Sequence, residues 1–192
     1  MMRIQTFARL ALGGALLAEG GMALRRFEHR RRAFAAAARR AAELGRPLVV
    51  VGDPDAGAHT RLMRAYDCGD LCIDLHGCPR CQAMQAADLT QGPIEGVADD
   101  STVVYVSCVL EYVSDPEAAL RELQRMAGSP DNLFLVFVEP WTLTAALYPG
   151  ARWVAIDQDP AAMKPIATPR KLATLGGLAG LLALALWPTR EH

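Results

Sequence analysis

The chain has 192 residues and a formal net charge of −1, and 52% of its residues are hydrophobic. This length suits one ordinary domain, and the apolar fraction is large enough to form a core, which excludes global disorder. The near-zero net charge excludes an overall basic field for binding nucleic acid. Five cysteines without a pairing pattern do not indicate a small secreted disulfide scaffold, so we expect a reducing compartment.

The first apolar segment covers residues 7–24 and contains two charged side chains. Such a run near the N-terminus resembles a signal peptide, but no convincing cleavage site follows it, and the arginines come after the run instead of before it. We therefore expect residues 1–26 to form a retained membrane-associated segment. Residues 27–46 are rich in Ala and Arg and predict a basic helix, with Gly45 as its C-terminal cap.

A second apolar segment lies at residues 172–187 and holds no charge. As a helix it would be about 24 Å long, slightly short of the roughly 30 Å of a bilayer core. Gly176 and Gly180 have the spacing that lets another membrane helix approach closely. Because the run is apolar on every side, a transmembrane or membrane-inserted helix within residues 164–192 is favoured over a buried helix of a soluble domain.

Basic residues separate the apolar ends from an acidic middle. Residues 25–40 contain seven Arg and one Glu, and Lys164, Arg170 and Lys171 precede the second apolar segment. Residues 47–163 carry 17 acidic residues against six Arg. By the positive-inside rule we expect the acidic body on the cytoplasmic side, with both apolar ends in the same membrane. Membrane lipid and other membrane-protein subunits are the expected partners. The arginines show no aromatic interleaving of the kind that stacks bases, so nucleic acid is not expected.

The middle of the chain alternates strand patterns with helical patterns. Apolar, partly β-branched runs predict strands at residues 47–51, 71–75, 102–108, 132–138 and 152–156. Helices are predicted at residues 56–66, 81–87 and 115–127. The last of these begins at Asp115-Pro116, with Ser114 and Glu117 at capping-box spacing. This alternation predicts an α/β fold, a Rossmann-like, doubly wound and mostly parallel sheet over residues 47–163.

In such a sheet, ligands bind beyond the carboxyl ends of the strands, near the switch in strand order. Three segments follow predicted strands: residues 52–57, the neighbourhood of Asp74, and residues 108–112. Asp74 lies 22 residues after Gly52, close to the spacing of an acid that binds both hydroxyls of a ribose. An acid at the end of a strand is also common as a turn or cap residue, and both interpretations stay open.

The stretch DDSTVVYVSCVLEYVSDPEAALRELQRM, residues 99–126, combines several features in a fixed order. These are an acidic loop, a strand, Leu110-Glu111-Tyr112-Val113, Asp115-Pro116, and a helix with Arg121-Glu122 and Arg125. The stretch resembles class I S-adenosylmethionine-dependent methyltransferases, most closely the small-molecule branch called type 11. The resemblance extends over residues 47–138. It implies S-adenosylmethionine as cofactor, with Asp74 at the ribose and Asp88 near the adenine.

The first glycine motif departs from that family's pattern. The family has an acidic residue in the strand and then Gly-x-Gly-x-Gly, whereas this chain has Val50 and then Gly52-Asp53-Pro54-Asp55-Ala56-Gly57. By resemblance, Gly52, Asp53, Asp55 and Gly57 would contact the cofactor. Pro54, however, has a fixed φ and no N–H where the backbone must approach closely, and the two acids would face the cofactor's carboxylate with like charge.

Four of the five cysteines, Cys68, Cys72, Cys78 and Cys81, follow the pattern C-x3-C-x5-C-x2-C. Four thiolates can hold a tetrahedral zinc ion, and Cys78-Pro79-Arg80-Cys81 is a ligand-like or redox-like pair. A disulfide is a further alternative. Unremarkable buried thiols are favoured, because a free cysteine is commonly a small buried hydrophobic residue.

Two functions are compatible with these features. The first is a membrane-anchored methyltransferase with a lipophilic or membrane-presented acceptor, which Glu111 and Tyr112 would contact because they follow a strand on the acceptor side. The second is a catalytically inactive methyltransferase-fold scaffold, or an interaction subunit of a membrane-associated assembly. The altered glycine motif and the two apolar ends favour this second function.

Overall fold

The computed structural model describes residues 2–56, 64–138, 150–156, 159–166 and 168–186. Its helices are α1 Met2–Leu44, α3 Pro116–Ala127 and α5 Thr168–Leu186, and a 3-10 helix η1 covers Pro130–Asn132. Its strands are β1 Leu48–Val51, β2 Leu71–Asp74, β3 Met84–Ala86, β4 Val103–Ser107, β5 Leu133–Val136, β6 Trp153–Ile156 and β7 Asp159–Pro165.

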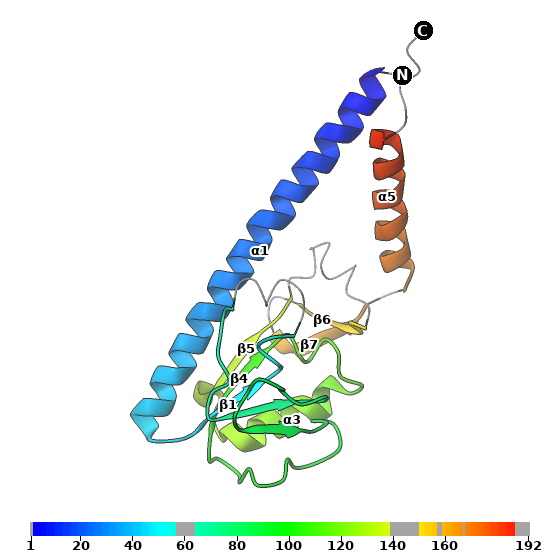
Figure 1. Cartoon of the computed structure of the whole chain (residues 1–192). Helices are drawn as coiled ribbons and strands as arrows, with labels where there is room; N and C mark the ends of the chain where they lie inside the picture. The colour runs from blue at the N-terminus through cyan, green and yellow to red at the C-terminus, as the bar shows by residue number, and fades with distance from the viewer. Residues whose placement is uncertain (1, 57–63, 139–149, 157–158, 167, 187–192) are drawn as a thin grey trace.

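Five strands form one parallel sheet in the order β3-β2-β1-β4-β5 (Figure 1). The central strand β1 pairs with β2 through Val50 and Cys72, and with β4 through Val50 and Tyr105. Strands β1, β2, β4 and β5 lie where the apolar runs predict them. The α/β class predicted from the sequence is therefore confirmed.

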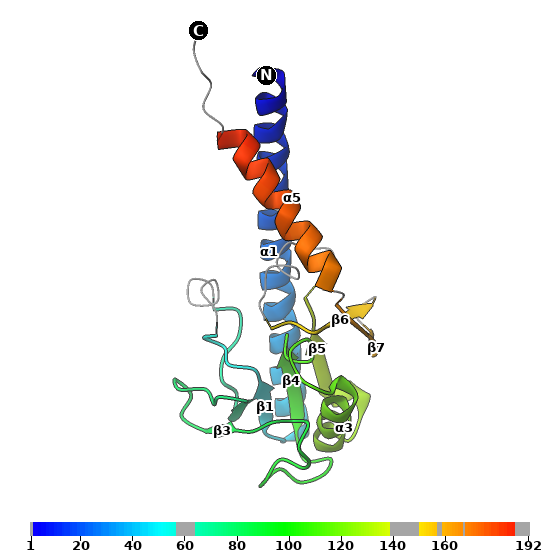
Figure 2. The same ribbon diagram turned by 90° about the vertical axis from the view of Figure 1, so that its right-hand side faces the viewer.

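Helices cover both faces of this sheet (Figure 2). Because successive side chains of a strand point to opposite faces, Val49 and Val51 pack with Leu123 of α3 on one face. Val50, between them, packs with Ala37 of α1 on the other face. The core therefore consists of two apolar layers, one on each side of the sheet, and strands buried on both faces read as continuous apolar runs.

Two segments differ from the predictions. Residues 81–87, predicted as a helix, contain strand β3, which pairs with β2 at the edge of the sheet. Pairing with an exposed strand edge here outweighs the helical propensity of Ala, Gln and Met. Residues 152–156 do contain a strand, β6, but it pairs antiparallel with β7 in a separate two-stranded sheet. The helix predicted at residues 56–66 falls mainly on residues 57–63, which lie outside the described residues.

Helix α3 has the predicted limits but a different N-terminal cap. Asp115, not Ser114, caps it, because the Asp115 carboxylate accepts a hydrogen bond from the N–H of Ala118 at 2.9 Å. Pro116 occupies the first helical position, where its missing N–H costs nothing. Gly128 ends the helix with a φ of 68°, a conformation that glycine adopts without strain.

Helix α1 joins two segments that the sequence suggests as separate, the apolar segment of residues 1–26 and the basic helix of residues 27–46. It runs for 43 residues without interruption. Its second half packs on the sheet and its first half extends away from it (Figure 1). By length and composition this helix can cross a membrane, with a mean hydropathy of 1.3 in its apolar part.

Helix α5 lies beside the first half of α1 in both views (Figures 1 and 2). Arg9 of α1 donates a hydrogen bond from Nε to the carbonyl oxygen of Ala185 at 3.1 Å. A Cβ added to Gly176 or Gly180 would meet nothing within 4 Å, so these glycines do not form the contact with α1. Both apolar ends of the chain thus extend from the same side of the sheet.

Candidate functional site

A cavity of about 570 Å³ lies at the carboxyl ends of β1, β2 and β4. This volume is in the range of about 300–1,000 Å³ typical of small-molecule sites. The cavity sits where the strand order reverses, since β2 and β3 lie on one side of β1 and β4 and β5 on the other. Parallel sheets bind ligands at such a reversal. The cavity wall includes Gly52, Asp53, Asp74, Asp88, Tyr112 and Arg30.

Gly52, the first residue after β1, is required by its surroundings. Its φ is +101°, and a Cβ there would lie 2.9 Å from Cγ2 of Val109 and 3.2 Å from the carbonyl oxygen of Ser107. Its N–H donates to the carbonyl oxygen of Ile73 at 2.9 Å. Only glycine combines this backbone conformation with so close an approach of two chain segments.

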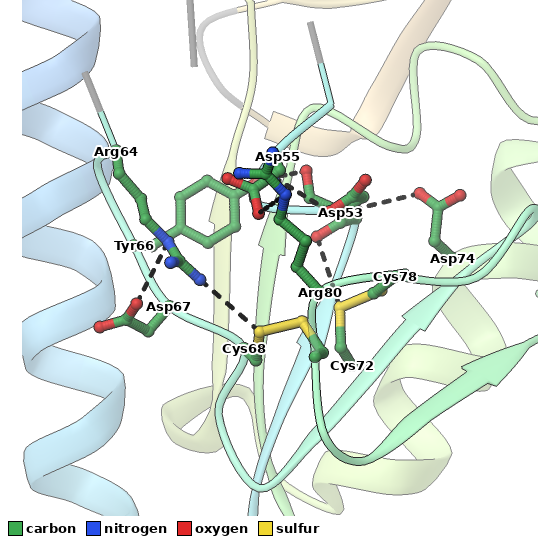
Figure 3. Close-up of a disulfide and its surroundings, with 12 residues drawn as sticks. Asp53, Asp55, Arg64, Tyr66, Asp67, Cys68, Cys72, Asp74, Cys78 and Arg80 are labelled. Atoms are coloured by element: carbon green, nitrogen blue, oxygen red, sulfur yellow. Dashed lines mark hydrogen bonds and ion pairs between the residues drawn. A yellow bond between two sulfur atoms is a disulfide. The ribbon is translucent and has the colours of Figure 1, made fainter. Parts of the chain in front are cut away.

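The backbone N–H groups of the loop after Gly52 are already hydrogen-bonded within the protein (Figure 3). The N–H of Asp53 donates to Oδ2 of Asp74 at 3.2 Å, and the N–H of Asp55 donates to Oδ1 of Asp53 at 3.0 Å. Pro54, between them, has no N–H to offer. Gly57, the last predicted cofactor contact of this loop, lies outside the described residues.

Asp74 has the turn role, one of the two interpretations that the sequence left open, and it also lies in the cavity wall. One carboxylate oxygen accepts the N–H of Asp53 and the other accepts the N–H of His76 at 3.0 Å, so the side chain holds the turn after β2. It also lines the cavity. Each carboxylate oxygen has a second lone pair, so Asp74 can accept hydrogen bonds from a ligand while it keeps the turn.

Asp88 lines the same cavity as Asp74, as expected of two residues that contact one ligand. Its Oδ1 accepts hydrogen bonds from the N–H of Thr90 at 2.9 Å and from the Thr90 hydroxyl at 2.7 Å. These two hydrogen bonds hold the pKa of Asp88 below its usual value. The carboxylate therefore stays charged at neutral pH.

Helix α1 contributes Arg26 and Arg30 to the cavity wall. The Arg30 guanidinium donates to Sγ of Cys108 at 2.9 Å, and the backbone oxygen of Arg30 accepts the hydroxyl of Tyr105 at 3.3 Å. The sequence pattern predicts these arginines only as basic residues beside the apolar segment. No local pattern reveals their place in the cavity, because it depends on how α1 packs on the sheet. The cavity wall therefore contains positive as well as negative side chains.

The end of β4 brings two more polar side chains to the cavity, Ser107 and Cys108. The Ser107 hydroxyl is buried beside the Tyr66 and Tyr105 hydroxyls and the Cys108 thiol. Cys108 has a φ of 55°, unusual for a residue other than glycine, and burial raises the pKa of its thiol. Ser107 and Cys108 therefore add polar groups to the cavity wall.

The two predicted acceptor contacts take different positions. Tyr112 lines the cavity. Glu111 is only 2% exposed, does not belong to the cavity wall as far as the chain is described, and accepts the N–H of Val138 at 2.6 Å through Oε1. Burial raises the pKa of Glu111 to about 7. Glu111 therefore holds the segment after β5, and Tyr112 is the better placed of the two for contact with a substrate.

The four clustered cysteines form two disulfides, Cys68–Cys81 and Cys72–Cys78, so the prediction of free thiols is wrong for this structure (Figure 3). The Cα atoms are 5.6 Å and 6.2 Å apart in the two pairs. The pairs lie next to the loop after β1, since Sγ of Cys72 is 3.9 Å from the carbonyl oxygen of Gly52.

Comparison of the chain with protein-family models, with curated proteins and with solved structures gives no match. The function of the cavity is therefore inferred from its own residues.

Proposed function

We propose that this chain is a membrane-anchored, Rossmann-like methyltransferase that binds S-adenosylmethionine in the cavity. The observation that carries the proposal is the meeting of Gly52, Asp74 and Asp88 in one cavity of about 570 Å³. The strand order β3-β2-β1-β4-β5 supports it, because dinucleotide-binding doubly wound sheets share this order. The resemblance of residues 99–126 to type 11 methyltransferases points in the same direction.

The residues of the cavity fit the chemical parts of this cofactor. Asp74 would accept hydrogen bonds from the ribose hydroxyls, and Asp88 would lie at the adenine. Arg30 would face the carboxylate of the methionine part, whereas Arg26, also in the cavity wall, is paired with Glu19. S-adenosylmethionine supplies an activated methyl group, so the chain has to position donor and acceptor.

The position of the cavity favours an acceptor that comes from the membrane. Arg40 of α1 contacts Asn132, just before β5, whereas Arg30 contacts Cys108, just after β4. Helix α1 therefore runs antiparallel to the strands. Its apolar first half extends beyond the carboxyl ends of the strands, where the cavity lies. A lipophilic acceptor held at a membrane surface would reach the cavity from this edge.

The first half of α1 has the features of a membrane segment. Residues 4–24 would be about 31 Å long as a helix, which matches a bilayer core of about 30 Å. Its charged groups are paired, Arg9 with the Ala185 carbonyl and Glu19 with Arg26 at 3.1 Å, as membrane segments require. Six of its large apolar side chains are between 58% and 80% exposed: Ile4, Phe7, Leu10, Leu16, Leu17 and Leu24.

We further propose that the sheet lies on the cytoplasmic side of this membrane. The arginines of residues 25–32 follow the apolar half of α1 directly, and Lys164 precedes α5. Both basic groups are on the side of the sheet, as the positive-inside rule expects of a cytoplasmic domain. Membrane lipid is then a partner, and contact with other membrane-protein subunits stays a prediction.

One observation favours the second candidate function, a catalytically inactive scaffold. The N–H groups of Asp53 and Asp55 already donate to carboxylates of the protein, those of Asp74 and Asp53, and Pro54 has no N–H. This loop would offer fewer backbone donors to a cofactor than a glycine-rich loop does. A scaffold would keep the fold and the membrane helices without binding the methyl donor.

Calorimetric titration of the full chain in detergent with S-adenosylmethionine tests the proposal. We expect measurable binding, reduced about 30- to 1,000-fold by Asp74→Ala. Asp74→Asn, which keeps an oxygen acceptor for the turn, should also weaken binding. Asp131→Ala is the matched control, because Asp131 is exposed and precedes β5. It therefore lies at the amino ends of the strands, opposite the cavity. Absence of binding in the unmodified chain would support the scaffold, and unchanged binding in Asp74→Ala would exclude Asp74 from the site.

A further inference from the structure

The four paired cysteines, Cys68, Cys72, Cys78 and Cys81, bring their sulfur atoms into one small volume, here called the cysteine cluster (Figure 3). The Sγ atoms of Cys72, Cys78 and Cys81 lie within 4.8 Å of one another. Cys68 Sγ is bonded to one of them, that of Cys81. Cys72 and Cys78 are fully buried and Cys81 is 8% exposed. Three of the four cysteines are therefore buried close together, and the half-buried Cys68 is bonded to one of them.

This arrangement is close to a tetrahedral metal site. A zinc ion takes four thiolates at about 2.3 Å each, which places the sulfur atoms about 3.8 Å apart. The three mutually close Sγ atoms already lie within 4.8 Å of one another. Cys68, whose Sγ is bonded to that of Cys81, is the candidate for the fourth position once its disulfide is reduced. The turn that presents Cys78 and Cys81 is closed by a hydrogen bond from the N–H of Cys81 to the carbonyl oxygen of Cys78 at 2.9 Å.

Arg64 lies against the cysteine cluster and Arg80 lies within its turn, and each is also paired with an acid, Arg64 with Asp67 and Arg80 with Asp55. A zinc ion with four thiolates carries a net charge of −2. The Arg64 guanidinium lies 3.7 Å from Sγ of Cys68, and Arg80 lies in the Cys78–Cys81 turn with its guanidinium 3.9 Å from Asp55 (Figure 3). Positive groups around a thiolate lower its pKa and stabilise a metal–thiolate complex.

We propose that the reduced chain binds one Zn²⁺ through the cysteine cluster and that the two disulfides are its oxidised, metal-free form. Each disulfide takes two electrons and two protons from one dithiol reductant, so two dithiols yield four cysteine thiols and two oxidised dithiols. Binding of Zn²⁺ then releases the four thiol protons. The site requires reducing conditions and does not depend on the methyltransferase proposal.

The zinc site also removes a conflict between two features of the chain. Disulfides persist in oxidising compartments, whereas the basic flanks of the apolar helices favour a cytoplasmic sheet, where thiols stay reduced. Zinc would keep the cysteine cluster compact in the reduced state. Because Cys72 lies beside the carbonyl of Gly52, the ion would stabilise the floor of the cavity.

Titration of the full chain with metal ions tests this site. The chain is purified in detergent with dithiothreitol, freed of metal, and titrated with Zn²⁺ and, in parallel, with Co²⁺. We expect one ion per chain, a rise of Tm with Zn²⁺, and the thiolate-to-cobalt charge-transfer absorption of a tetrahedral sulfur site with Co²⁺.

Variants identify the ligands. Cys72→Ser and Cys78→Ser should each lower the Zn²⁺ affinity by more than the roughly 10- to 100-fold typical of groups outside the ligand shell. Cys108→Ser is the matched control, because Cys108 is the free cysteine outside the cluster. We expect this variant to bind Zn²⁺ with the affinity and stoichiometry of the unmodified chain. Absence of the cobalt absorption in the unmodified, reduced chain would overturn the proposal without recourse to any variant. Disulfides that resist dithiothreitol in the folded chain would also overturn it. So would a loss of Zn²⁺ affinity in Cys108→Ser as large as in the cluster variants.

Discussion

At the scale of single residues, Glu111 shows how burial changes the chemistry of a side chain. Its Oε1 accepts the N–H of Val138 and its backbone oxygen accepts the N–H groups of Arg152 and Trp153 at 2.7 Å and 3.1 Å. Its Oε2 has no hydrogen-bond partner among the described residues. The carboxyl therefore holds the segment after β5, and the backbone oxygen holds the start of β6. Burial raises the pKa of the carboxyl to about 7 and makes its ionised form costly.

Glu111→Gln should stabilise the protein in a pH-dependent way. Below the usual pKa of Glu, near 4.5, the carboxyl is protonated in the folded and unfolded states, so ionisation costs nothing. Between pH 4.5 and about 7 the unfolded state ionises first, which destabilises the fold, and above pH 7 the penalty reaches its full value of about 3 kcal/mol. We expect the variant to gain up to this amount, relative to the unmodified chain, between pH 5 and pH 8.

Denaturant unfolding at several pH values measures this difference. Glu117→Gln is the control, since the Glu117 side chain is 88% exposed. Unfolding free energies of the unmodified chain and of Glu111→Gln that run parallel from pH 5 to pH 8 would contradict the prediction.

Arg30 offers a second test at this scale, on the proposed cofactor site. Replacing Arg30 with Gln removes the positive charge that would face the cofactor's carboxylate. Loss of a charged hydrogen bond should weaken S-adenosylmethionine binding about 10- to 150-fold. Arg39→Gln is the control on the same helix, because Arg39 is exposed and is not part of the cavity wall. Equal affinities of the two variants in calorimetry would remove Arg30 from the proposed site.

At the scale of elements, helix α3 shows a structural use for the residues that carry the family resemblance. Glu122 accepts hydrogen bonds from the N–H of Ile94 at 2.8 Å and from Arg125 at 2.6 Å. Arg125 also pairs with Asp99 at 2.6 Å and donates to the carbonyl oxygen of Val97 at 2.9 Å. Together they attach residues 94–99 to α3. Burial alone would raise the pKa of Glu122, but these hydrogen bonds lower it below its usual value.

Arg125→Ala should therefore destabilise the protein by about 2–3 kcal/mol, because it leaves the buried carboxylate of Glu122 without its counter-ion. Arg121→Ala is the matched control on the same helix. Its side chain is 68% exposed and lies 4.0 Å from Glu117, so we expect a change within about 0.5 kcal/mol. Thermal or denaturant unfolding at neutral pH measures both, and equal effects would show that the Glu122 pair contributes nothing special.

At the scale of the whole molecule, one helix connects the membrane segment with the cavity. The second half of α1 packs on the sheet, Arg26 and Arg30 line the cavity, and the first half pairs with α5. The sheet is therefore oriented relative to the proposed membrane, with the carboxyl ends of its strands toward it. In our proposal, the cofactor site and a membrane-presented acceptor would then meet at the carboxyl ends of the strands.

Protease accessibility tests the proposed orientation. Protease added to the outside of intact cells should leave residues 47–163 uncut, because we place the sheet on the cytoplasmic side. The same protease should cut this region once detergent opens the membrane, which controls for intrinsic resistance of the fold. Cleavage within residues 47–163 in intact cells would reverse the orientation and would favour persistent disulfides in the cysteine cluster.

The sequence by itself determined the α/β class, four of the five strands of the parallel sheet and the limits of α3. These features follow from local patterns. A strand buried on both faces is apolar at every position, as in Leu48–Val51. The limits of α3 are marked by Pro116 at its first position and by Gly128 as its C-terminal cap. The apolar ends and their basic flanks are also visible in the order of residues alone.

Only the tertiary structure decided which distant residues meet. Strand β3 is three residues long and exists because β2 offers it a partner, so its helical composition was misleading. Arg30 reaches Cys108 across 78 positions of the chain, and Cys68 pairs with Cys81 instead of Cys72. Glu111, adjacent to Tyr112, is buried below the cavity while its neighbour lines it. Such contacts depend on the packing of α1 and of the strand ends, and local propensity carries no record of them.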